Sequence, residues 1–315
     1  MSRRLPAISR LVSVLCLIGA AWAGRLAHAL PIAGPDLGGH PRLIVRAPDS
    51  LRGAAARLRS LPPGQLDGVM RLMGMASPGP PILVVLAPEG SDLARGIPPW
   101  VSGYAYGERG IVVLFPSRAP TYPDFSLEGV LRHEVAHVLA ARAAHEWPLP
   151  RWFDEGLAML AGASWSFDDR SQVLLALLVD GRMPLFQLES RFSGTQREIA
   201  GAYALAGAFL RDIVQRHGPG APARILAAVA RGLPFDQAFA RATGSSLTFA
   251  EDQFWSHYSL RRWLPLATSS ATLWLAITLL FLYARRRRRL RDAALRARWD
   301  AEETSSAAGG DEPVN

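Results

Sequence analysis

The chain has 315 residues, of which 49% are hydrophobic and 20% charged, enough to form the core of one medium-sized domain with short attachments. Its net charge of +8 comes mainly from the two ends: residues 1–29 hold four arginines and no acid, and residues 285–315 hold eight arginines against six acids. The stretch between them is nearly neutral, which argues against a nucleic-acid-binding protein despite the basic composition.

Residues 1–29 have the charged, apolar and small-residue parts of a secretory signal peptide. Two arginines near the start precede an apolar run at residues 11–23, which is too short to cross a bilayer comfortably. We predict cleavage after Ala29, with residues 21–23 as a second possible site. The only cysteine, Cys16, lies within this segment, so cysteine usage says nothing about the redox compartment of the mature chain.

Residues 30–262 are predicted to form one extracytoplasmic domain of the α+β class, which begins with a small mixed sheet. The pattern of apolar and turn residues predicts strands at residues 43–45 and 82–86, a helix at 51–61 and a hairpin at 100–106 and 111–115. The run at residues 82–86 is apolar throughout, which is typical of a strand buried on both faces.

A longer helix is predicted over residues 126–144, because apolar residues recur there at helical spacing. It contains the pentapeptide His133-Glu134-Val135-Ala136-His137. Residues four apart lie on one side of a helix, so both imidazoles can reach a single metal ion, and the spacing suits Zn²⁺. Glu134 is close enough to such an ion to act as a base toward water.

A second signal follows in Arg-Trp-Phe-Asp-Glu-Gly-Leu-Ala at residues 151–158. Pro148 and Pro150 end the preceding helix and its loop, and another helix is predicted from about residue 151 to 163. A short loop brings two helices back antiparallel, so Glu155 can face the two histidines. Two imidazoles and one carboxylate, with a fourth position left for water, are typical of a catalytic zinc site.

His-Glu-x-x-His followed by Trp-Phe-x-Glu-Gly-Leu-Ala resembles the gluzincin metallopeptidases, the group that contains thermolysin and the aminopeptidase-N-like enzymes. The bacterial peptidase MA-like domains are the most similar. The resemblance covers about residues 43–258, and it implies a zincin-like fold in which His133, His137 and Glu155 bind Zn²⁺ and Glu134 is the general base. It also suggests that residues 101–106 form a sheet edge that pairs with an extended peptide substrate; a purely structural hairpin is an equal alternative.

Two departures from these relatives matter. Thermolysin-like enzymes have an acidic residue four positions after the glutamate ligand, where it orients a histidine, and here that position is Met159. The groups that orient His133 and His137 are therefore not identified by the sequence. Aminopeptidase-N-like enzymes bind the free amine of the substrate with a glutamate on the edge strand, and Gly-Tyr-Ala-Tyr-Gly at residues 103–107 has none. The sequence thus favours an endopeptidase.

The second half of the domain is predicted to be helical. Helical periodicity separated by Gly or Pro predicts helices at residues 170–179, 196–217, 221–231, 234–242 and 247–263. Tyr203 belongs to this half. Related enzymes have a tyrosine or histidine that donates a hydrogen bond to the developing oxyanion, and we assign this catalytic role to Tyr203, with a core tyrosine as the alternative.

Residues 263–284 are almost entirely apolar, have aromatic residues at both ends and are followed by five arginines. This pattern predicts a transmembrane helix with the arginine side in the cytoplasm. Residues 285–315 would then form a basic and afterwards disordered cytoplasmic tail. The predicted catalytic domain would face the periplasm or exterior of a bacterial cell, on the inner membrane.

The sequence as a whole predicts a single-pass membrane zinc metallopeptidase that hydrolyses peptide or protein substrates outside the cytoplasm. Two other classes stay open. One is a zincin-like binding module without catalysis, against which the intact Glu134 argues. The other is an envelope assembly or signalling factor, in which residues 285–298 bind anionic lipid or a cytoplasmic partner.

Overall fold

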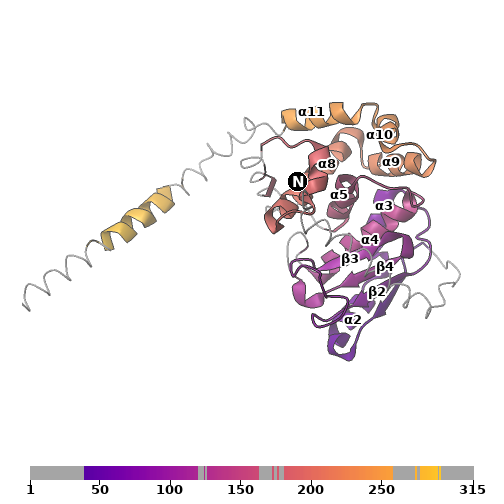
Figure 1. Cartoon of the computed structure of the whole chain (residues 1–315), viewed down its shortest axis with the longest axis horizontal. Helices are drawn as coiled ribbons and strands as arrows, with labels where there is room; N and C mark the ends of the chain where they lie inside the picture. The colour runs from indigo at the N-terminus through magenta and orange to yellow at the C-terminus, as the bar shows by residue number, and fades with distance from the viewer. Residues whose placement is uncertain are drawn as a thin grey trace, which may run out of the picture. The chain divides into compact units, whose positions relative to one another are not determined.

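The computed structural model of the chain describes residues 39–119, 124, 126–162, 172–173, 176, 181–257, 274, 277–289 and 291 (Figure 1). The predicted signal peptide, most of the predicted membrane span and most of the tail lie outside these residues. The chain divides into two compact units, Met1–Phe254 and Trp255–Asn315. In the second unit the described residues are helical, and none of the helices in the described part of the chain has both the length and the apolar character needed to cross a membrane.

The first unit begins with a four-stranded mixed sheet, as the sequence predicted. Its strands are β1 (Leu43–Arg46), β2 (Ile82–Leu86), β3 (Gly103–Tyr106) and β4 (Ile111–Leu114), arranged in the order β1-β2-β4-β3. Strands β1, β2 and β4 run parallel, whereas β3 pairs antiparallel with β4. The predicted hairpin is therefore confirmed, and β3 forms one edge of the sheet.

Burial on both faces explains why the central strands consist almost entirely of Ile, Leu and Val. One face of the sheet packs against the helix α4 (Leu127–Ala143). On the other face, Leu83, Val113 and Phe115 form a core cluster with Ala87 and Ala94, which belong to the connection after β2. Parallel strands covered on both sides have no solvent-facing side, so alternation of polar residues is absent.

Outside the sheet, the described part of the chain up to residue 257 consists of helices joined by turns and loops. Its remaining helices are η1 (Asp49–Leu51), α2 (Arg52–Arg59), η2 (Pro63–Leu66), α3 (Asp67–Met73), η3 (Gly107–Arg109), η4 (Pro116–Arg118), α5 (Arg151–Gly162), α7 (Leu185–Arg191), α8 (Gln196–His217), α9 (Ala221–Ala230), α10 (Phe235–Thr243) and α11 (Leu247–His257). The predicted helix at residues 196–217 coincides with α8. The helices α3 and α7 were not predicted, since seven residues are too few to establish a helical period. The helix predicted at residues 170–179 lies mostly outside the described residues.

The sheet, α4, α5 and α8 follow one another as successive layers (Figure 1). Close contact between α5 and α8 is possible because Gly156 has no side chain: a Cβ atom there would lie 3.0 Å from the carbonyl oxygen of Ala206. The aromatic rings of Trp152 and Phe153 on α5 are buried, and Trp152 packs edge-on against Phe209 of α8. These contacts fix α5 between its two neighbours.

The turn after β3 lies directly on α4. A Cβ atom added to Gly107 would lie 2.8 Å from the Ala141 Cβ atom and 3.3 Å from the carbonyl oxygen of His137. The substitution Gly107→Ala should therefore lower the free energy of unfolding by about 1–3 kcal/mol, through overpacking. Gly53→Ala is a matched control, because Gly53 is exposed on α2 with open space around it. The free energy of unfolding of this variant should be unchanged or slightly raised. Urea unfolding of both variants measures the difference, and equal effects would contradict this packing.

Candidate metal centre

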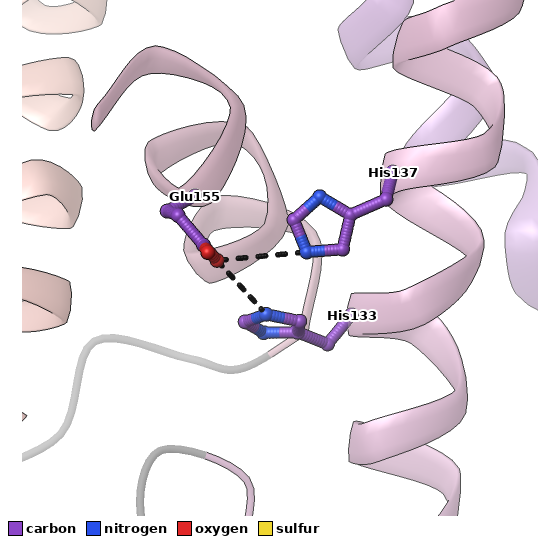
Figure 2. A group of neighbouring side chains, drawn as sticks. All are labelled: His133, His137 and Glu155. Atoms are coloured by element: carbon purple, nitrogen blue, oxygen red, sulfur yellow. Dashed lines mark ion pairs between the residues drawn. The ribbon is translucent and has the colours of Figure 1, made fainter. Parts of the chain in front are cut away.

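The two histidines of the pentapeptide project from the same side of α4. The helix begins at Ser126, whose hydroxyl oxygen accepts a hydrogen bond from the amide of Gly129 at 3.0 Å, as expected for an N-cap residue. His133 and His137 are one turn apart, and their ring centroids are separated by 5.1 Å. Figure 2 shows both imidazoles pointing toward a side chain of the neighbouring helix.

That side chain is Glu155 of α5. The chain reverses direction through residues 144–150, where His145 and Glu146 adopt left-handed backbone angles. At the start of α5 the amides of Arg151 and Trp152 both donate to Oε1 of Glu189 on α7, which caps the helix. The second helix therefore begins at a fixed position, and its fifth residue faces the histidines as the sequence predicted.

The three side chains present their ligand atoms to one point. Oε2 of Glu155 lies 3.6 Å from Nε2 of His133 and 3.5 Å from Nε2 of His137, and the three ligand atoms lie within 4.8 Å of one another. Ligands of a tetrahedral zinc ion are about 3.4 Å apart, given bond lengths of about 2.0–2.2 Å. No residue in the described part of the chain donates a hydrogen bond to the buried Oε2 atom. The spacing, the donor set and this unpaired oxygen all fit a metal ion.

Two further carboxylates hold the imidazoles from behind. Oδ2 of Asp154 lies 2.9 Å from Nδ1 of His137 and is hydrogen-bonded to it. Oδ2 of Asp124 lies 3.1 Å from Nδ1 of His133, an ion-pair distance, although the direction is not that of a well-formed hydrogen bond. With Nδ1 facing a carboxylate, each ring directs Nε2 toward the metal position, as metal-binding histidines commonly do.

The sequence analysis missed both of these aspartates. Asp154 directly precedes Glu155, so its position beside the ligand was a signal that could have been used. Asp124 gave no such signal, because it precedes α4 and belongs to neither motif. It fits where two glycines leave room: a Cβ atom at Gly162 would lie 2.6 Å from Oδ1 of Asp124, and one at Gly129 would lie 3.4 Å from the Asp124 Cβ atom. Met159 instead packs against Gly207 of α8.

The charges of this group interact strongly. Burial lowers the pKa of His137, but the adjacent Asp154 carboxylate outweighs it and raises the pKa to about 9. Burial opposes the protonation of His133 in the same way, and the charge of Asp124 still raises its pKa well above the usual value. Burial raises the pKa of Glu155, but its interactions with the two imidazoles prevail and lower the pKa to about 2. In the metal-free protein both imidazoles thus hold protons at neutral pH.

Glu134 and Tyr203 lie beside the ligands, as predicted. Burial raises the pKa of Glu134 to about 7, partly opposed by the charges of the two histidines. The ring of Tyr203, from α8, lies 5.9 Å from that of His133. Both residues line two adjoining hollows, of about 280 and 750 Å³, and the larger one runs along β3. Burial and the Glu155 charge raise the pKa of Tyr203, so its hydroxyl keeps its proton at neutral pH.

Comparisons of the chain with protein-family models, with curated proteins and with solved structures find no match.

Metal binding should release protons. Neutral imidazole is the ligand form, and the pKa values of His133 and His137 are raised, so Zn²⁺ must displace about two protons at pH 7. Apparent affinity should therefore increase as the pH rises toward about 9, the pKa of His137. Calorimetric titration of the metal-free full chain, in buffers of different ionisation enthalpy, measures the number released. Constant affinity across this pH range would contradict the assignment.

The two aspartates should contribute to affinity without being ligands. We expect Asp124→Asn and Asp154→Asn to weaken metal binding about 10–100-fold each, because the imidazoles lose their negatively charged partners. Asp67→Asn is the matched control. Asp67 is also paired with a histidine, since its Oδ1 atom lies 2.7 Å from Nδ1 of His40, but that histidine is not a candidate ligand. Competition with a coloured chelator gives the affinities. An unaltered affinity in both variants would show that the aspartates do not support the ligands.

Proposed function

We propose that this protein is a zinc metallopeptidase of the gluzincin type that hydrolyses peptide bonds. The observation that carries the proposal is the convergence of His133, His137 and Glu155 on one buried point, with Glu134 beside it and an open groove in front. The two motifs, their order along the chain and their helical setting support the zincin-like fold and the peptidase MA-like resemblance. His133, His137 and Glu155 would hold the ion.

The choice of zinc follows from the ligand set. Two imidazoles and one carboxylate, each with a polar partner behind it, are the donors of catalytic zinc sites. When bound, zinc supplies Lewis acidity, which makes water a stronger acid and a carbonyl a better electrophile.

In the proposed reaction, Glu134 transfers the proton from the attacking water to the leaving amine. Its carboxyl group is buried between β3 and the histidines: a Cβ atom at Gly103 of β3 would lie 3.1 Å from the Glu134 Cγ atom. A carboxylate next to the ion can accept a proton from water as it attacks the scissile carbonyl, and can then deliver it to the leaving amine. In the metal-free protein, burial raises the pKa of this carboxyl group to about 7.

The substrate would lie along the larger hollow. Strand β3 is an edge strand of the described sheet, and an extended peptide can pair with it through backbone hydrogen bonds. Tyr203 of α8 lines the same groove, and its protonated hydroxyl can donate a hydrogen bond to the developing oxyanion. Residues 103–107 carry no carboxylate for a free amine, which favours an endopeptidase.

The location of the activity is proposed from the sequence alone. Residues 1–29 as a secretory signal and residues 263–284 as a membrane span would place the catalytic domain outside the cytoplasm of a bacterial cell. The arginines at residues 285–289 would stay on the cytoplasmic side.

The substitution Glu134→Gln tests the mechanism. It removes the proton acceptor and keeps the shape, so peptide hydrolysis should fall at least 100-fold while zinc content stays at the wild-type level. Glu128→Gln is the control, because Glu128 lies on the same helix and pairs with Arg57 instead. Digestion of a peptide library, with and without chelator, measures activity. A Glu134→Gln protein that cleaves as fast as wild type would refute the mechanism, and a zinc-loaded wild type that cleaves nothing would favour the binding module.

A further inference from the structure

We propose that Arg151 makes the smaller hollow a binding pocket for a carboxylate of the substrate. The inference rests on the proposed peptidase function and narrows its substrate class. The carboxylate is either an acidic side chain next to the scissile bond or the carboxyl terminus of the peptide. Arg151 is not one of the three candidate metal ligands, and its position in the structure suggests a role of its own.

The guanidinium group of Arg151 is held in place but has unused donors. Its Nε atom lies 3.4 Å from Oε1 of Glu155, the oxygen that does not face the imidazoles, and its Cζ atom lies 4.9 Å from the centre of the Phe192 ring. These contacts orient the side chain, which is 43% exposed. The group forms an ion pair with Glu155 through Nε, and its two terminal nitrogens have no hydrogen bond to a residue that the structure describes. A fixed guanidinium fork with open donors matches the geometry of a carboxylate.

The hollow around it is lined partly by acceptors, Asp124, Glu134 and Gln196 among them, but none of these is hydrogen-bonded to the terminal nitrogens of Arg151. Arg151 is the only arginine among the described residues that line this space of about 280 Å³, and much of the remaining wall is apolar, with Val130, Phe192 and Ile199. Trp100 also lines it, and its buried indole N–H has no hydrogen-bond acceptor in the described part of the chain. A buried unpaired donor calls for a partner. The apolar wall suits the carbon chain of a ligand, and the guanidinium of Arg151 and the indole N–H of Trp100 suit its anionic end.

The negative groups nearby do not serve as that partner. Asp124 faces His133 at 3.1 Å, and Glu134 is buried beside the two histidines. Because Glu134, His133 and Tyr203 line both hollows, a ligand in the smaller one lies next to the reacting bond. Selection by Arg151 would therefore act on the residue adjoining the cleaved peptide bond.

Matched peptides test this. Both series start from a peptide that the wild type cleaves. In the first series, the residues flanking the scissile bond are changed from Gln to Glu. In the second, a C-terminal carboxamide close to that bond is changed to a free carboxylic acid. The wild type should prefer the carboxylate in one of the two series, which identifies its source. Arg151→Gln should reduce that preference in kcat/KM about tenfold or more, and Arg151→Lys should retain part of it. Arg52→Gln, a change at an exposed arginine of α2 that lines neither hollow, should leave the preference intact.

The results separate this role from a structural one. If Arg151 only positions Glu155, Arg151→Gln will slow all peptides alike and lower the zinc content, and the inference is wrong. It is also wrong if the wild type shows no carboxylate preference in either series. Binding of the same peptides to zinc-loaded Glu134→Gln protein is measured in parallel. If the Glu134→Gln protein binds the carboxylate peptides more tightly and Arg151→Gln removes this preference, the pocket is upheld. This holds even if the wild type cleaves none of the peptides, because the absence of cleavage would overturn only the peptidase proposal.

Discussion

The contact on which the centre depends is the approach of the Glu155 carboxylate to the imidazoles of His133 and His137, at 3.5–3.6 Å. Asp124 and Asp154 add negative charge behind the rings, and Glu134 lies beside them. Carboxylates removed from water need positive charge close by. Two imidazolium protons provide it in the metal-free protein, and a divalent cation can replace both protons with no change in net charge. A metal ion bound here would thus balance the charge of the histidines and carboxylates as the two protons do.

Packing elsewhere keeps this group in place. Helix α4 lies on the sheet, and α5 lies between α4 and α8, where Gly156 permits close approach and the Trp152 and Phe153 rings are buried. Glu189 of α7 fixes the first turn of α5. None of these residues faces the metal position, yet each determines where a ligand lies. A centre supported in this way needs little rearrangement when an ion binds.

The same arrangement brings the proposed substrate groups to one side. Strand β3 contacts α4 closely because Gly103 has no side chain, so the edge of the sheet, Glu134 and the ligands border a common groove. Arg151 and Tyr203 reach this groove from α5 and α8. Proton transfer, oxyanion stabilisation and carboxylate recognition, as proposed, would all depend on the positions of four neighbouring elements.

The amino-acid sequence alone determined the α+β class, the main strands and long helices, and the residues His133, Glu134, His137 and Glu155, because periodicity and i, i+4 spacing are local properties of the chain. It left α3 and α7 undetected, since short helices depend on packing more than on their own propensity. Only the tertiary structure decided that Asp124 and Asp154 support the histidines and that Arg151 and Trp100 share a hollow. These residues meet through chain segments that are distant in sequence, and a pattern within one segment carries no information about such contacts.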